Sequence, residues 1–310
     1  MYFPYLRGRQ FELIALRELV EEKKISEKVI PVVEPINPSS TLLKTIQAFI
    51  KENREIAIVL NPVVGEFSKK LEKMGKDNSE LADSIYRLIR ENDNVVKSFI
   101  MNRSVSQLIK EKKEKERFLI VNNDRDCLDD FLGVYDDSLP RFALIPDDRA
   151  FRRVISDRKV LFEDNFKKRL RNIDYIDSED EFFSDSHLYY KNENCIGFAD
   201  YSIVGEEFNE SGFAPVAVAI HLVYFDTKKN LRIHHFVSDS NVGHEDPAGK
   251  FGEALEKLVA WCTENNVKRT LGLQGFYDCY GTGKYPGLGT VKKLSIMHHI
   301  ELVSGFLGGK

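Results

Sequence analysis

The chain has 310 residues, of which 42% are hydrophobic and 30% charged, a composition typical of a folded globular protein rather than a disordered or fibrous one. Its 45 basic and 49 acidic side chains give a formal net charge of −4, which does not indicate general attraction to nucleic acid, although a local patch could still bind it. No apolar run approaches the roughly 18 residues of a membrane-spanning helix, and the first residues lack the pattern of a signal peptide, so a cytoplasmic protein without a membrane segment is expected.

Short β-branched segments alternate with amphipathic segments over the first two thirds of the chain. This alternation is typical of βα units around a parallel sheet. Eight such units in roughly 200 residues predict a small (β/α)8 fold, similar to a TIM barrel. An open doubly wound sheet is the alternative, because the sequence does not show whether the sheet closes. Strands are predicted at residues 2–6, 29–33, 56–60, 97–101, 118–122, 141–145, 159–162 and 195–199, and helical segments include 10–22, 41–53, 80–92 and 104–115.

The last third of the chain has a different pattern. The acidic segment 177–185 is expected to be an exposed loop. From residue 216, two alternating segments flank the polar turn DTKKN and predict an antiparallel hairpin. Two helices should follow, one starting at Pro247 with Asp246 as its N-cap and one starting near Thr290.

No linker or repeat divides the chain. We therefore expect a single barrel-like unit over residues 1–310. Within it, residues 1–205 would form the core βα repeats. Residues 206–310 would form the hairpin and the C-terminal helices, packed on the barrel or completing it.

A polar residue follows every predicted barrel strand. Because parallel strands all end on one face of a barrel, these residues are expected on the rim where barrel enzymes keep their active sites. The carboxylates could hold a divalent cation, Mg²⁺ or Mn²⁺, and the amides and the guanidinium could bind a polar ligand. The eight residues are Arg7, Glu34, Asn61, Asn102, Asn123, Asp147, Glu163 and Asp200.

The same residues have a structural interpretation. Short βα loops use Asp and Asn as helix N-caps, and a cap oxygen contributes about 1 kcal/mol. Glu is a poor N-cap, so this alternative is weaker for Glu163 and for Glu34, which is flanked by prolines. These two positions favour a site more than the other carboxylates do.

Residues 284–293, KYPGLGTVKK, form a Gly-rich turn before the last predicted helix. The free N–H groups of a helix start attract anions, so Lys284, Gly287 and Gly289 are candidates for an anion site. The glycines also suit a tight turn with Thr290 as N-cap. The pattern is not that of a P-loop.

The histidines favour structural roles over a zinc site. His298 and His299 are neighbours on a helix and project about 100° apart. His234 and His235 lie on opposite faces of a strand, and His221 could meet one of them across the hairpin. A cross-strand pair without two further ligands is a weak zinc signal.

The opening segment, YFPYLRGRQFELIALREL, resembles the start of the phage-type beta-protein family and, more closely, of a related and poorly characterised bacterial family. The resemblance continues through GFADYSIVGEEF, FAPVAVAIHLVYF, HHFVSDSN, GKFGEALEKLV and YPGLGTVKKLSIMHHIEL. It implies that the gene is paired with one for a protein similar to PD-(D/E)xK nucleases, in an arrangement typical of mobile defence modules. It implies no catalytic set.

Two functions are therefore predicted. The first is a non-catalytic partner or regulator of a nuclease-like protein in a two-gene bacterial defence or toxin–antitoxin-like module, with a binding surface on the hairpin and C-terminal helices. The second is a barrel enzyme, a metal-assisted hydrolase or phosphodiesterase. That enzyme would act at the rim through Glu34, Asp147, Glu163 and Asp200, and its carboxylates should not be paired with arginine or lysine.

Overall fold

The computed structural model describes residues 1–77, 79–209 and 216–309, so the start of the segment FAPVAVAIHLVYF lies outside the described residues. The chain forms two compact units. The first comprises Met1–Asp164 and Ser186–Tyr201, and the second comprises Asn165–Asp185 and Ser202–Lys310. Residues 165–185 thus group with the C-terminal part of the chain, although the sequence placed them in the barrel core. The expectation of a single unit stays a prediction.

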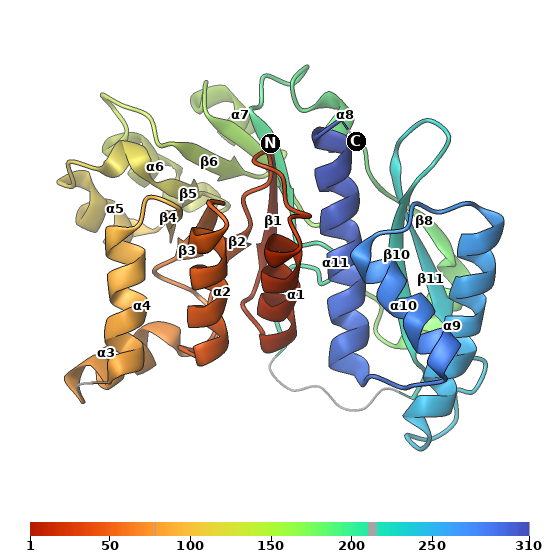
Figure 1. The fold of residues 1–310 in the computed structure, drawn as a ribbon. Helices are drawn as coiled ribbons and strands as arrows, with labels where there is room; N and C mark the ends of the chain where they lie inside the picture. Colours follow the sequence, from red (N-terminus) through yellow and green to blue (C-terminus); the bar gives the residue numbers. More distant parts are fainter. Residues whose placement is uncertain (78, 210–215, 310) are drawn as a thin grey trace. The chain divides into compact units, whose positions relative to one another are not determined.

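The first unit is a closed barrel of eight parallel strands (Figure 1). This confirms the predicted (β/α)8 fold, and the open doubly wound sheet is wrong. Each of the eight predicted strands corresponds to a barrel strand, and the first and last close the ring through a β1–β9 pairing. The strands are β1 (Tyr2–Leu6), β2 (Val32–Val33), β3 (Ile56–Val59), β4 (Val95–Ile100), β5 (Leu119–Val121), β6 (Phe142–Ile145), β7 (Lys159–Glu163) and β9 (Gly197–Asp200).

Helices connect the barrel strands, and several of the connecting loops end in a side-chain cap. Ser39 accepts a hydrogen bond from the Leu42 backbone N–H at 3.1 Å, and Asp148 accepts one from Ala150 at 2.7 Å. These caps satisfy donors that a helix start leaves without a partner. The helices are α1 (Gln10–Glu21), α2 (Ser40–Lys51), α3 (Phe67–Lys76), α4 (Glu80–Glu91), α5 (Arg103–Lys110), α6 (Leu128–Val134), α7 (Arg149–Val154) and α8 (Ser186–Tyr189).

Alternate residues of each strand fill the barrel interior, because successive strand residues point to opposite faces. The interior residues of β7 include Phe162, and those of β1 include Tyr5. With Tyr201, just beyond β9, these rings form a cluster with centroids 4.6 to 5.3 Å apart. The alternation decides which rim residues point into the barrel and which point outward.

The second unit contains a three-stranded antiparallel sheet in the order β10-β11-β8, formed by β8 (Asp180–Ser184), β10 (Ala219–Phe225) and β11 (Leu231–Val237). The hairpin of β10 and β11 is confirmed, and its register places His221 opposite His235. The predicted exposed loop at 177–185 is wrong. Residues Asp180–Ser184 form the edge strand β8, in which Phe183 and Ser184 are buried. Part of the acidic segment is therefore a strand.

The helices of the second unit are α9 (Pro247–Glu264), α10 (Leu271–Thr282) and α11 (Leu288–Leu307). Helix α9 begins as predicted, since Asp246 accepts a hydrogen bond from the Gly249 N–H at 2.8 Å. The last helix begins at Leu288, near the predicted start, but its N-cap is Gly287 and not Thr290. Gly287 has a φ of 84°, which a larger residue would adopt only with strain. Among the described residues, no helix is long and apolar enough to cross a membrane.

Helices cover both faces of the hairpin. Tyr224 and Phe225 are successive strand residues and point to opposite faces. Trp261 of α9 packs edge-on against Tyr224, with ring centroids 4.8 Å apart, and Phe306 of α11 lies 5.2 Å from Phe225. The hairpin is therefore part of the core of this unit (Figure 1).

Helices α10 and α11 approach each other closely at Gly272. A Cβ atom at Gly272 would lie 2.2 Å from the Leu294 carbonyl oxygen and 2.6 Å from the His298 backbone nitrogen. Gly281 in the same helix has no atom within 4 Å of such a position. The two glycines thus form a matched pair, one at a crowded position and one in open space.

We predict that Gly272→Ala lowers the free energy of unfolding by about 1–3 kcal/mol, because the backbone of α11 must move. Gly281→Ala should raise it by about 0.5–1 kcal/mol through helix propensity. Urea denaturation followed by the fluorescence of Trp261, the only tryptophan, measures both. Equal effects of the two substitutions would contradict this packing.

Candidate functional site

Glu34 lies inside the carboxyl end of the barrel. It stands two residues beyond Val32, an interior residue, and its exposed fraction is 0%. Tyr5 donates its hydroxyl hydrogen to Oε2 at 2.8 Å, and the Val63 backbone N–H donates to Oε1 at 2.8 Å. Arg7 donates from Nη1 to Oε2 and forms an ion pair with the carboxylate. Both carboxylate oxygens are therefore bound within the protein.

Arg7 is buried between two aromatic rings. Its guanidinium carbon lies 5.5 Å from the centroid of Tyr5 and 5.2 Å from that of Tyr201, within range of cation–π attraction. Burial acts to lower the pKa of Arg7, but Glu34, Tyr5 and Tyr201 together outweigh it, so the pKa is raised and the guanidinium stays charged. Burial and then Glu34 raise the pKa of Tyr5 well above its usual range. The result is a buried ion pair enclosed by tyrosines.

The predicted amides are divided among structural roles and the surface. Asn61 donates to the Ile100 carbonyl at 2.8 Å and accepts from the Ile100 N–H at 2.9 Å, which joins the end of β3 to β4. Asn102 caps α5 by accepting from the Val105 N–H at 2.9 Å. Asn123 is exposed. The cap interpretation thus holds for Asn102.

The four predicted carboxylates do not meet at one point. Glu163 and Asp200 are register partners on β7 and β9, and both follow interior residues, so they lie side by side on the outer face. Asp200 is buried and accepts from the Tyr2 hydroxyl at 2.9 Å, and Glu163 accepts from Ser186 Oγ at 2.8 Å. Asp147 lies in an exposed loop, paired with Arg152 at 2.7 Å.

The Gly-rich turn before α11 has a structural explanation. The Lys284 N–H donates to the Cys279 carbonyl at 3.1 Å and completes the end of α10, while the Lys284 side chain is exposed. Gly287 is the N-cap of α11, and Gly289 lies in the first turn of that helix. The anion site at Lys284, Gly287 and Gly289 stays a prediction.

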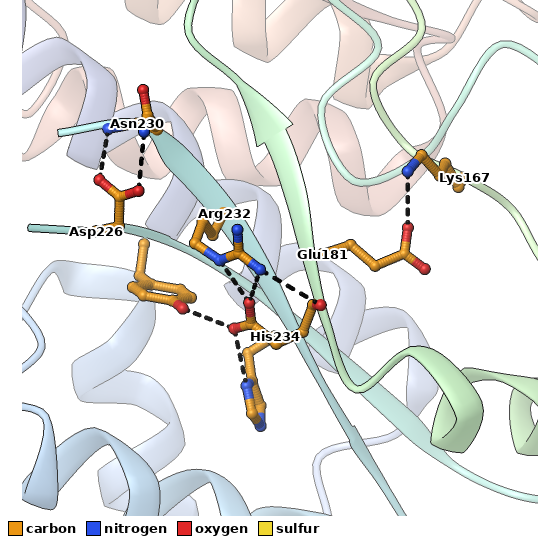
Figure 2. Close-up of polar contacts among 8 residues, drawn as sticks. Lys167, Glu181, Asp226, Asn230, Arg232 and His234 are labelled. Carbon is orange, nitrogen blue, oxygen red and sulfur yellow. Dashed lines mark hydrogen bonds and ion pairs between the residues drawn. The ribbon is translucent and has the colours of Figure 1, made fainter. Parts of the chain in front are cut away.

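A polar cluster that the sequence analysis missed surrounds Asp180 on the sheet of the second unit; its members Arg232 and His234 are labelled in Figure 2. The Tyr224 hydroxyl donates to its carboxylate at 2.6 Å, Arg232 Nε donates at 2.5 Å, and His234 Nδ1 lies 3.3 Å away. The Trp261 ring stacks on His234 at 4.5 Å. Burial, followed by the hydrogen bond to Asp180, raises the pKa of Tyr224 to about 12. These contacts anchor the edge strand β8 to both strands of the hairpin.

The opposite face of this sheet holds a histidine pair. His221 Nδ1 lies 2.7 Å from His235 Nδ1, which confirms the predicted meeting across the hairpin. One ring must donate and the other accept, so at least the accepting ring is neutral, and burial lowers the pKa of both rings. Tyr175 packs against both rings at 4.6 Å. Among the described residues, no three His, Cys, Asp or Glu side chains are grouped to hold a metal ion.

The adjacent histidines of α11 diverge as predicted. His298 Nδ1 lies 2.7 Å from Thr270 Oγ1, and its Nε2 donates to the Val223 carbonyl at 2.8 Å. His299 Nδ1 lies 2.9 Å from Ser202 Oγ. Each ring therefore binds a different part of the same unit.

Comparison with known proteins identifies no relative. No family model matches the chain, and neither curated proteins nor solved structures give a significant match. The resemblance to the beta-protein family therefore stays a prediction from the sequence.

We predict that acid destabilises the second unit through its buried histidines. Burial lowers the pKa of His235 and of His298 to about 4 and that of His221 well below 6.5. These rings take up protons in the unfolded chain near pH 6.5 but resist them when folded, so stability should fall as the pH drops from about 6.5 toward 4. Each histidine contributes about 1.4 kcal/mol per pH unit within this window.

Urea denaturation between pH 6.5 and 5, above the range where most carboxylates titrate, measures this slope. Besides burial, nearby charges act on the rings of His235 and His221. Glu181 and Asp180 raise the pKa of His235, whereas His234 and Arg169 lower it. His235 and Lys292 lower the pKa of His221. His235→Gln removes one of the groups that take up a proton on unfolding. The slope of the free energy of unfolding against pH should therefore become shallower by up to about 1.4 kcal/mol per pH unit. A profile that is flat over this range would contradict the prediction.

We predict that Asp200→Asn lowers the free energy of unfolding by about 1.5–3 kcal/mol, because the Tyr2 hydroxyl binds a buried, charged acceptor. Asp147→Asn should cost less than about 1 kcal/mol, since its ion pair with Arg152 is exposed. Urea denaturation of both variants, with and without Mg²⁺ or Mn²⁺, measures this. If both variants are more stable than the parent, the carboxylates instead belong to a ligand site.

Proposed function

We propose that this protein is a non-catalytic partner of a nuclease-like protein in a two-gene bacterial defence or toxin–antitoxin-like module. The resemblance over the whole chain supports the identity of the partner. The non-catalytic role is supported by two ion pairs among the predicted rim residues. Arg7 binds Glu34, and Arg152 binds Asp147. The barrel enzyme required carboxylates without such cationic partners.

We place the partner surface on residues 165–185, the segment that leads into β8. Leu170, Ile176 and Phe182 have exposed fractions of 96%, 52% and 46%. Fully burying such a side chain contributes about 1.5–3 kcal/mol, so three of them within one segment favour contact with another protein. The sequence predicted this surface on the hairpin and the C-terminal helices, and the hairpin is covered by those helices.

Several charges of this segment are already paired. Glu181 is paired with Arg169 and, at 3.4 Å, with Lys167 (Figure 2 shows the Lys167 pair). Asp180 is held by Arg232. Centres of protein interfaces are depleted in charged residues, and a buried charge is costly unless it is paired. A partner would therefore meet apolar side chains beside satisfied ion pairs, with β8 kept in place by the Asp180 cluster.

We predict that the protein co-purifies with the product of the neighbouring nuclease-like gene when both are expressed together. Leu170→Ser combined with Phe182→Thr should weaken the complex at least about tenfold, equivalent to about 1.4 kcal/mol. Titration of the purified partner, followed by calorimetry, measures the affinity.

The matched control is Val242→Ser, which alters a side chain of the same unit that is 86% exposed. It should leave the affinity unchanged. Two folded proteins that fail to associate would refute the proposed function. Equal weakening by the control would refute the location of the surface.

A further inference from the structure

Two adjoining cavities lie against β4 in the first unit. One has a volume of about 80 Å³ and the other about 640 Å³, and both are lined by Arg90 and Lys97. Lys97 follows the interior residue Val96, so its side chain leaves the outer face of the barrel. Because Arg90 and Lys97 line both cavities, the two adjoin, and we refer to them together as the groove. The larger cavity has a volume typical of small-molecule sites.

The smaller cavity is lined by four cations, Arg90, Lys97, Arg117 and Arg141, and by two carboxylates, Asp93 and Glu114. Arg141 is fixed by Glu55 through two hydrogen bonds of 2.7 and 2.9 Å. The other three cations pair with exposed carboxylates: Arg90 with Glu91, Arg117 with Asp93, and Lys97 with Glu114 at 3.4 Å.

Exposed ion pairs of this kind contribute little to stability. A phosphate group carries more charge than one carboxylate and accepts bidentate hydrogen bonds from arginine. It can therefore replace Asp93 and Glu114 as the partner of Arg117 and Lys97. The small cavity has the size for one such group, and Arg117 and Lys97 are free to bind it once Asp93 and Glu114 are displaced.

The larger cavity has an apolar wall of Leu60, Phe67, Leu71 and Ile89, together with the half-exposed ring of Tyr86. Ser68 and the carboxylates Glu72 and Asp83 also line it. An exposed tyrosine ring is a stacking surface for a nucleobase. A ligand that spans both cavities should therefore combine a planar, weakly polar group with a phosphate.

We infer that this groove binds a nucleotide, with its phosphate among Arg90, Lys97 and Arg117 and its base beside Tyr86. A third cavity, which shares Arg141, is lined by Glu116, Asp136 and Asp137. A longer nucleic acid continuing in that direction would meet these carboxylates. The free nucleotide is thus favoured over a strand. This site is independent of the proposed partner surface.

The test is calorimetric titration of the full chain with AMP, GMP, adenosine, inorganic phosphate and a single-stranded oligodeoxynucleotide bearing a 5′-phosphate. We expect AMP or GMP to bind at least about tenfold more tightly than adenosine or phosphate alone, because only a nucleotide uses both cavities. Binding of none of these probes would overturn the inference. Tighter binding of the oligonucleotide would overturn the assignment to a free nucleotide.

Three variants locate the site. Lys97→Ala with Arg117→Ala should weaken nucleotide binding at least about tenfold, and Tyr86→Ala should weaken it several-fold. Lys44→Ala removes an exposed cation from α2 and should have no effect. Unfolding midpoints of all variants should match that of the parent, since the altered side chains are mainly surface groups. Equal weakening by Lys44→Ala would show general charge attraction and overturn the site.

Discussion

The constraint on which the barrel depends is the burial of the Arg7–Glu34 ion pair in its interior. Removing two charges from water is costly unless each has a partner and its remaining donors and acceptors are satisfied. Tyr5 and the Val63 N–H bind the carboxylate, and the rings of Tyr5 and Tyr201 enclose the guanidinium. The pair therefore connects the ends of β1 and β2 to the loop after β3 and to the residue beyond β9, next to the β1–β9 pairing that closes the barrel.

This arrangement changes how the rim is interpreted. The carboxyl end of a barrel is where catalytic groups are usually found. Here Glu34 and Arg7 satisfy each other, Asp200 and Glu163 lie on the outer face, and Asp147 is bound in a loop. The barrel acts as a scaffold in our account, with binding at surfaces away from its centre. Asp180 has the corresponding role in the second unit, because it holds β8 in register two residues from the exposed Phe182.

Much of the fold could be predicted from the sequence, because buried parallel strands are continuous β-branched runs with polar ends. The sequence analysis missed strand β8 because Asp180 and Glu181 are adjacent charged residues. They interrupt the alternation of polar and apolar side chains that predicts a strand. Helix α10 was missed because it contains three glycines, and at least Gly272 is required by the contact with α11 rather than by helix propensity. In both places tertiary contacts override the local signal.

The candidate site was less predictable than the fold. The sequence placed Glu34 and Arg7 on one rim but could not show that they bind each other, because that depends on the register of β1 and β2. Counting from an interior residue would have shown that Glu163 and Asp200 point outward. The Asp180 cluster combines residues from three strands, so it required pairings that no local pattern contains.

The most direct test of this account is a double-mutant cycle on Arg7→Met and Glu34→Met, with the free energy of unfolding measured in urea. Either substitution alone leaves an uncompensated buried charge and should cost about 3–5 kcal/mol. The double variant should cost far less than the sum, because it leaves no charge without a partner. Single substitutions that are neutral or stabilising, and that add without coupling, would contradict a structural ion pair and return the rim to the role of a ligand site.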